Sequence, residues 1–256
     1  MPNPVRRSLY TLPFGRDLCD ATVSEIFSRV GNDPLALSNV ILLLPNNRAV
    51  KSMTDAFVRQ LKPGLLLPRM AAVGDLGLDE SLGPLLDPLD SASVILPAIE
   101  PMRRLLLLTR LVLKQRAAAG ANVTTTEALR FAKKLAEVID ELEIEQIDFA
   151  EFDNIQPEAQ DLAGHWQSSY ADLLQLIPAY QKELAAIGCI GPSARRNILL
   201  ARLAKYFADH PPAGWIIAAG LSTAAPAVAK LLRNVAMLPQ SMVILPSIDL
   251  DMTDSQ

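Results

Sequence analysis

Short apolar runs that stop at a proline or a glycine recur along the chain. These runs are Ser8–Leu12, Val40–Leu44, Leu65–Leu67, Trp215–Ala219 and Met242–Leu245. Near-continuous apolar runs predict strands covered on both faces, as in a parallel sheet, because a strand with one wet face would alternate. A proline follows every run except Trp215–Ala219, which stops at Gly220. Since proline cannot extend a central ladder, each proline predicts the carboxyl end of a strand.

Helical periodicity fills the segments between several of these runs. Within Asp20–Val30, apolar residues recur at helical spacing, and Ala49–Leu61 repeats the pattern. A further helix is predicted over Pro226–Met237, between the last two strands. Alternating strands and helices predict an α/β fold with a parallel sheet.

The middle of the chain reads differently, because helical patterns follow one another without strands. The predicted helices are Pro101–Ala119, Thr125–Glu145, Gln156–Ile187 and Ala194–Ala208. Thr124 and Glu127 have the spacing of a capping box, while Gly188–Pro192 and Pro211–Pro212 predict helix ends. We therefore expect an α/β domain made of residues 1–99 and 211–256, interrupted by a helical insertion over residues 100–210. Because the chain ends soon after a strand, we also expect it to be a fragment.

Composition narrows the functional classes. Half of the residues are apolar and the net charge is only −4, so any nucleic-acid contact must be local. Cys19 and Cys189 are the only cysteines, too few for a disulfide framework or a four-cysteine metal site, and they fit a reducing, cytoplasmic location. We expect both to be small buried residues. No apolar stretch reaches the length of a membrane span without a charge or a proline.

Two strand-to-helix loops near the start of the chain are candidates for phosphate binding. The first, Pro13–Asp17, has one glycine and no lysine, so a working ATP-binding loop is not expected and Arg16 is read as a surface charge. The second contains Asn46 and Arg48, with Lys51 one turn further on. Helix amides at the carboxyl end of a parallel strand favour anions, so Arg48 and Lys51 are candidate phosphodiester ligands. Alternatively, Asn46 or Asn47 only caps the helix and Arg48 is solvated.

Three other places carry candidate side chains. Ser222 and Thr223, in the loop before the Pro226 helix, are candidates for phosphate binding or for helix capping. Two local patches of cations could neutralise phosphates, one formed by Arg48, Lys51 and Arg59 and the other by Arg103, Arg104 and Arg110. Arg195 and Arg196 lie at the amino-terminal end of a predicted helix, where the helix dipole disfavours cations. Their position indicates a phosphate or carboxylate partner, and the acidic stretch Glu137–Asp153 could supply the carboxylate.

No catalytic or metal site is predicted. His165 and His210 lack a cysteine, histidine or carboxylate at ligand spacing, and no nucleophile and base pair up. The carboxylates of Glu137–Asp153 alternate with apolar residues as on a solvated helix face, which we favour over acid–base or metal chemistry. We therefore expect no cofactor.

Read together, several stretches resemble the AddB family of the type found in alphaproteobacteria. The matching stretches, in chain order, are Val40–Ala49, Leu65–Asp75, Gly164–Gln167, Gly191–Leu200, Ile216–Gly220 with Pro226, and Leu238–Asp249. The resemblance implies a RecA-like domain of the superfamily 1 helicase type with a helical insertion, followed in full-length proteins by a second helicase-like domain and a nuclease domain. It also implies an AddA-type partner subunit that carries the ATP-driven motor, and a role in processing broken DNA ends.

The chain departs from the family pattern at two loops. The family usually has Thr-Arg-Arg where this chain has Asn46-Asn47-Arg48, and Ser-Thr-Gly-Ser where it has Leu221–Ala224. Among the loop residues, Arg48 is therefore the better candidate for a DNA contact.

The leading hypothesis is a non-catalytic, helicase-like module that holds DNA weakly and assembles with its partner during double-strand break repair. Two alternatives stay open. One is a divergent NTPase in which another cation meets the phosphates. The other is a protein-interaction scaffold, which predicts exposed leucine and isoleucine on the Pro101–Ala119 helix.

Overall fold

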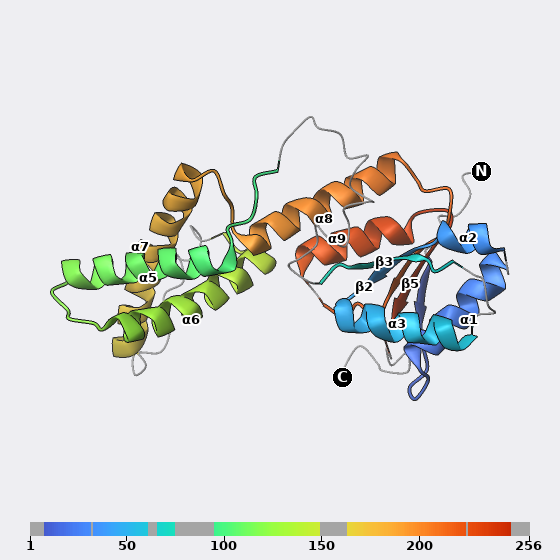
Figure 1. Cartoon of the computed structure of the whole chain (residues 1–256), viewed down its shortest axis with the longest axis horizontal. Helices are drawn as coiled ribbons and strands as arrows, with labels where there is room; N and C mark the ends of the chain where they lie inside the picture. The colour runs from blue at the N-terminus through green and yellow to red at the C-terminus, as the bar shows by residue number, and fades with distance from the viewer. Residues whose placement is uncertain are drawn as a thin grey trace. The chain divides into compact units, whose positions relative to one another are not determined.

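The computed structural model describes residues 8–31, 33–60, 66–74, 95–148, 163–223 and 225–246 (Figure 1); for Pro34 and residues 163–171 it describes the backbone only. The chain divides into two compact units. The first draws on Met1–Ser91 and Leu199–Gln256, and the second on Ala92–Ile198. The expected insertion, residues 100–210, is thus shifted towards the amino terminus, because the second half of one long helix belongs to the first unit.

The first unit contains a parallel sheet. Its strands are β1 (Leu9–Thr11), β2 (Ile41–Leu44), β3 (Arg69–Ala72), β4 (Ile216–Ala219) and β5 (Ser241–Leu245). Their order across the sheet is β1-β5-β4-β2-β3, and every neighbouring pair is parallel. The predicted α/β class with a parallel sheet is therefore confirmed.

The third predicted strand was placed wrongly. The strand was expected over Leu65–Leu67 with Pro68 at its carboxyl end, whereas β3 begins immediately after Pro68. Leu66 and Leu67 are exposed, and Leu65 lies outside the described residues. The backbone N–H of Arg69 donates to the Val40 carbonyl at 2.9 Å and starts the ladder with β2. Because the ladder needs no donor from the preceding residue, proline is tolerated at the start of this edge strand.

Helices cover both faces of the sheet (Figure 1). They are α1 (Leu18–Val30), α2 (Pro34–Ser38), α3 (Asn47–Gln60), α9 (Pro226–Ala236) and the second half of α8 (Pro192–Asp209). On one face, α1 and α3 pack against the side chains of Leu42, Leu44 and Ile217. Helix α9 covers the opposite face near β4 and β5, where its own Val228, Leu231 and Val235 are buried. The short helix α2 was not predicted.

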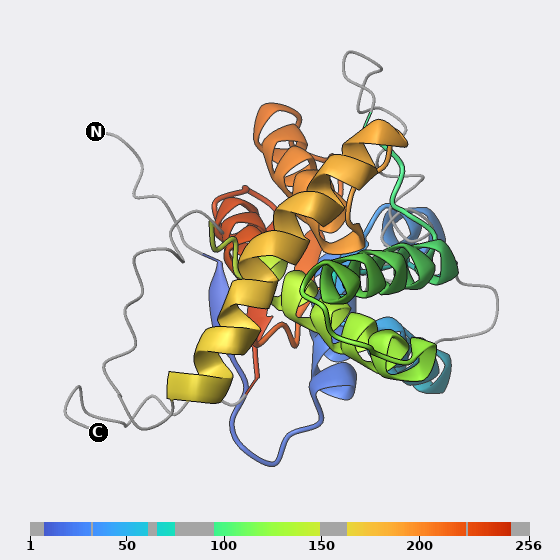
Figure 2. The same cartoon turned by 90° about the vertical axis from the view of Figure 1, so that its left-hand side faces the viewer.

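The second unit is helical. It contains α5 (Pro101–Ala118), α6 (Thr125–Ile144), α7 (Ala163–Ala186) and the start of α8. Helices α5 and α6 run side by side, and α7 passes diagonally across this pair (Figures 1 and 2). The predicted capping box at α6 is present, since the Thr124 side chain accepts from the Glu127 N–H and Glu127 accepts from the Thr124 N–H. The core joins Leu108, Leu135 and Tyr180 among other residues.

The helix ends predicted at Gly188 and Pro211 are present, whereas α8 begins at Pro192, two residues before the predicted start at Ala194. Helix α7 ends at Ala186, before Gly188, and α8 ends at Asp209, before Pro211. The first residues of the helix predicted over Gln156–Ile187 lie outside the described residues. None of the described helices has the length and apolar character that a membrane crossing requires.

Candidate nucleic-acid interface

The carboxyl ends of the parallel strands bring the predicted loop residues to one edge of the sheet. Strands β2 and β4 are neighbours, with Leu42 opposite Ile217. A Cβ built at Gly220, after β4, would lie 4.0 Å from the Pro45 side chain, after β2, so the two loops adjoin. A Cβ built at Gly74, after β3, would lie 2.0 Å from the Pro45 carbonyl oxygen. The edge is therefore closely packed around the start of the β2–α3 loop.

The β2–α3 loop presents two cations at the start of a helix. Asn46 accepts a hydrogen bond from the Ala49 backbone N–H at 2.9 Å, which caps α3. Arg48 and Lys51 lie in the first two turns of α3, are exposed, and have no ion-pair partner within the described part of the chain. Cations repel the positive end of a helix, so these two side chains gain most from an external anion.

Asn46 caps helix α3, which was one of the two roles that the sequence left open for it. Its side chain points at its own helix, which leaves Arg48 and Lys51 as the members of this loop that can meet a ligand without breaking an existing contact. Buried Met53, Ala56 and Phe57 hold α3 against the sheet, so the two cations stand on the outward side of a fixed helix.

The β4–α9 loop carries Ser222 and Thr223. Both side chains are exposed, and the Thr223 hydroxyl accepts a hydrogen bond from the Ala225 backbone N–H at 3.2 Å. Helix α9 begins at Pro226, and Ala225, at its N-cap position, supplies no side-chain hydrogen bond. Pro226 has no N–H, and the next two residues, Ala227 and Val228, are buried, so this loop offers its exposed hydroxyls rather than helix amides. Ala224 lies outside the described residues.

These two loops leave the sheet in opposite directions. Helix α3 packs on the face that bears Leu42 and Leu44, whereas α9 packs on the other face. In open α/β sheets, the point at which neighbouring strands send their helices to opposite faces is where ligands bind, at the carboxyl ends of the strands. Arg48 and Lys51 lie on one side of this point, and Ser222 and Thr223 on the other.

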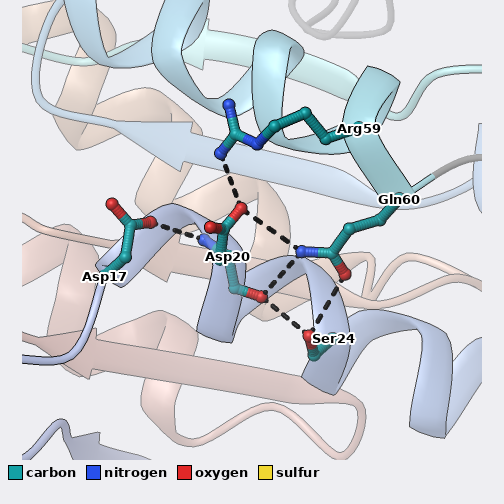
Figure 3. Close-up of polar contacts among 5 residues, drawn as sticks. All are labelled: Asp17, Asp20, Ser24, Arg59 and Gln60. Atoms are coloured by element: carbon teal, nitrogen blue, oxygen red, sulfur yellow. Dashed lines mark hydrogen bonds and ion pairs between the residues drawn. The ribbon is translucent and has the colours of Figure 1, made fainter.

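A different arrangement occupies the first strand-to-helix loop, where a nucleotide-binding protein would hold phosphate. The Asp17 carboxylate accepts a hydrogen bond from the Asp20 backbone N–H at 2.8 Å and caps α1 (Figure 3). A carboxylate of the chain itself thus takes the position of an anion at this helix terminus. Arg16 is exposed, as expected.

Asp20 connects the start of α1 with the end of α3 (Figure 3). Its carboxylate accepts from Arg59 at 2.6 Å and from the Gln60 amide at 3.4 Å, while the Gln60 oxygen accepts from the Ser24 hydroxyl at 3.1 Å. The hydrogen bond from Arg59 is the main reason that the pKa of Asp20 lies below its usual range. Arg59 is therefore engaged in this network of hydrogen bonds. Its pairing with Asp20, 39 residues away, could not be predicted from sequence spacing.

Arg103 and Arg104 are consecutive in sequence, but their side chains lie in different environments. Arg103 is exposed near the start of α5. Arg104 is only 7% exposed, and its guanidinium donates to Tyr180 at 3.0 Å, to Asp140 at 2.7 Å and to the Ala136 carbonyl at 3.3 Å. We therefore withdraw the nucleic-acid contact expected of Arg104, whose donors stabilise the helical unit. Arg110, at the surface of the same helix, pairs with Glu183.

The acidic stretch is only partly a solvated face. Glu137 and Glu141 are exposed, but Asp140 accepts from the Ser193 hydroxyl at 2.7 Å and Glu143 from the Ala194 N–H at 3.0 Å. The start of α8 thus meets the expected carboxylates through a hydroxyl and a backbone amide. The Arg195 guanidinium donates to the Leu96 carbonyl. The residues of this stretch from position 149 onwards lie outside the described residues.

The described residues do not bring the remaining candidates together in a metal site. Within the described ranges, no three histidine, cysteine or acidic side chains gather to hold a metal ion. His210 stacks on Tyr206 at 5.0 Å, and the side chain of His165 is not among those described. Cys19 and Cys189 are half-buried rather than fully buried, and desolvation is the main cause that raises the pKa of Cys19.

Comparison with models of known protein families and with curated proteins finds no match for this chain.

Proposed function

We propose that this chain is a non-catalytic, helicase-like module of a double-strand break repair helicase–nuclease subunit, which helps to hold DNA and to assemble with an AddA-type partner. The RecA-like identity of its sheet is part of the proposal. The main support is the placement of Arg48 and Lys51 opposite Ser222 and Thr223 at the point where β2 and β4 send their helices to opposite faces.

The side chains at this point suit a phosphodiester. Arg48 and Lys51 supply positive charge, and Ser222 supplies an exposed hydroxyl. Phosphate contacts of this kind position a protein on DNA without reading its sequence. We therefore expect binding that depends little on base sequence.

We propose that this module is not catalytic because of the contacts in the loop between β1 and α1. Asp17 already supplies the anion at the α1 amino terminus, and a nucleotide phosphate there would meet this carboxylate and that of Asp20. A divergent NTPase would have to displace both charges. This makes the NTPase alternative the weaker one.

The binding should be weak and sensitive to salt, because the net charge is −4 and only a local patch is cationic. Each phosphate neutralised contributes about 0.7 to 0.9 to the slope of log affinity against log salt. Two cations therefore predict a slope of about −1.5.

Fluorescence anisotropy of the full chain with a labelled duplex carrying a single-stranded tail, over a series of salt concentrations, tests the proposal. Arg48→Ala and Lys51→Ala should each weaken binding and make the slope shallower by about 0.7 to 0.9, the contribution of one phosphate contact. The matched control is Lys205→Ala, which removes an exposed cation from the end of α8 that leads to the amino end of β4. Binding that responds equally to all three variants, or no binding even at low salt, would refute this interface.

One observation favours a second role in assembly. On α5, Met102 and Leu106 are 60% and 59% exposed, and their spacing puts them on one stripe of the helix. This agrees with the expectation of exposed apolar residues on that helix, although no isoleucine is involved. Glutamate at both positions should reduce co-purification with a co-expressed AddA-type subunit and leave DNA anisotropy unchanged. Unchanged co-purification would remove this helix from the interface.

A further inference from the structure

Strand β1 lies at the end of the sheet, and among the described residues its one strand neighbour is β5. Its residues are unusually open for a strand of a parallel sheet, since Leu9 is 54% and Tyr10 is 43% exposed. Parallel strands are normally covered on both faces, so a parallel edge strand with two exposed large side chains is incompletely covered.

The register fixes which backbone groups face outwards. Leu9 pairs with Val243, and the Val243 N–H donates to the Ser8 carbonyl at 2.7 Å. In a parallel ladder, the residues on either side of the paired position bond to the neighbour, so Ser8 and Tyr10 face β5. The N–H and carbonyl of Leu9 therefore point away from β5, towards the edge.

A hollow lies beside this strand on each face of the sheet. On the α9 face, a cavity of about 510 Å³ is lined by Leu9, Leu232 and Val243, together with other residues of α9, β5 and the β4–α9 loop. On the α1 face, a cavity of about 610 Å³ is lined by Tyr10, Ile244 and residues of α1. Side chains of an extended strand alternate between the two faces of a sheet, so a strand added at this edge would direct its side chains alternately into the two cavities.

The two cavities differ in chemistry. The described lining of the cavity on the α9 face is mostly aliphatic and contains one charged residue, Arg233. The described lining of the cavity on the α1 face contains three carboxylates, Asp17, Asp20 and Glu25, and one cation, Arg16. It also contains Thr22, whose hydroxyl is buried and has no hydrogen-bond partner among the described residues.

The three carboxylates differ in how many ion pairs and hydrogen bonds they already make. Asp20 and Glu25 have ion-pair partners, Arg59 and Arg29, in partly exposed pairs. Asp17 accepts one backbone hydrogen bond and has no ion pair within the described part of the chain. A carboxylate accepts several hydrogen bonds, so Asp17 can take a cation without losing its role as a helix cap.

We propose that the open edge of β1 binds an extended segment of a partner protein in which aliphatic residues alternate with lysine or arginine. The segment adds a strand to the sheet, with its aliphatic side chains in the cavity beside α9 and its cations in the cavity beside Asp17. This proposal does not rest on Arg48 or Lys51, although the cavity beside α9 is also lined by Ser222 and Thr223 of the β4–α9 loop, where a DNA contact is proposed above.

Charge complementarity favours such a partner over a second copy of this chain. If two copies paired through β1, each would offer the other Leu9, Tyr10 and Thr11, none of which carries a charge. Within these three residues, such a pairing would bring no cation to the carboxylates on the α1 face.

Fluorescence anisotropy of the full chain with short labelled peptides tests this inference. The probe alternates valine with lysine, and a second peptide has glutamate in place of lysine. Asp17→Asn keeps a capping side chain but removes its charge, so it should weaken binding of the lysine peptide several-fold and not that of the glutamate peptide. Leu9→Pro should weaken binding by about tenfold through the lost edge N–H, whereas Leu9→Ala keeps that donor.

Backbone N-methylation provides a test that needs no variant of the protein. In an extended peptide, the valine N–H groups point to one edge and the lysine N–H groups to the other. Strand addition therefore requires that methylating one set abolishes binding while methylating the other does not. Equal binding of both methylated peptides, equal binding of the lysine and glutamate peptides, or concentration-dependent self-association that blocks the peptide would each overturn the proposal.

Discussion

The side-chain carboxylate of Glu143 accepts a hydrogen bond from the backbone N–H of Ala194 at 3.0 Å, so the end of α6 caps the start of α8. Gly191 leaves room for this contact, because a Cβ built there would lie 2.8 Å from both carboxylate oxygens. Asn197 adds a hydrogen bond from its amide to the Glu143 carbonyl. A helix terminus inside the second unit therefore depends on one partly buried acid.

This arrangement predicts a stability contribution that depends on pH. Burial is the main cause that raises the pKa of Glu143, and the charge of Asp140 acts in the same direction. A raised pKa in the folded state means that the protonated form is favoured by folding. The contribution to stability is thus fully present below the ordinary carboxyl pKa and is lost as pH rises through the folded-state pKa. Glu143→Gln, which keeps an acceptor oxygen, should remove this loss.

Urea unfolding of both proteins at several pH values from mildly acidic to neutral measures the effect. The free energy of unfolding of the glutamine variant, relative to the wild type, should increase as pH rises. Other carboxylates with shifted pKa values, such as Glu127 and Asp20, contribute equally to both proteins and cancel in the difference. A difference that does not change with pH would mean that Glu143 is solvated at the start of α8.

Arg104 supports a second prediction, because its guanidinium is buried against Asp140 and Tyr180. Arg104→Met keeps much of the apolar stem but leaves the Asp140 carboxylate without its cation. Removing one partner of a buried ion pair costs about 3 kcal/mol of unfolding free energy. The Asp140 side chain is 22% exposed, so water limits the penalty and we expect about 2 to 3 kcal/mol.

The same helix provides a matched control. Arg110 pairs with Glu183 at the same distance, 2.7 Å, but its side chain is 65% exposed. Arg110→Met should therefore cost at most about 1 kcal/mol. Adding Asp140→Asn to Arg104→Met should recover part of the loss, since the buried charge is then gone. Equal destabilisation by the two arginine variants would show that the Arg104 pair is not shielded from water.

The sequence predicted the repeating units of the fold because these depend on local patterns. Apolar runs located four strands to within a residue or so, and the Thr124 capping box marked the start of α6. The error at β3 arose where a proline was taken for an end although it marks a beginning, a distinction that depends on which N–H starts the ladder with β2. The helix α2 is too short for periodicity to reveal.

The candidate site was less predictable because side-chain roles depend on distant partners. Arg103 and Arg104 are indistinguishable in sequence, yet Arg104 alone turns inwards, towards a carboxylate 36 residues away. Asp17 and Asp20 have the spacing of a helix cap, a local signal that could have assigned Asp17 correctly. The pairing of Asp20 with Arg59 required the tertiary structure.

Asn46 allows the structural and binding roles of the β2–α3 loop to be separated. Asn46→Ala removes the cap of α3, which should lower the free energy of unfolding by about 1 kcal/mol. Once the fraction of folded protein is taken into account, DNA binding of this variant should stay near that of the wild type, because Arg48 and Lys51 are retained.

Asn46→Asp should behave in the opposite way. Aspartate caps α3 as well as asparagine does and suits the positive helix end, so stability should be unchanged or slightly higher. Its charge lies beside Arg48, however, and opposes an approaching phosphate, so DNA affinity should fall and the salt dependence should become shallower by about 0.7 to 0.9. Unfolding curves and anisotropy titrations of both variants give the two readouts. If Asn46→Asp binds DNA like the wild type, phosphate does not approach this loop, and any DNA contact of the chain must lie elsewhere.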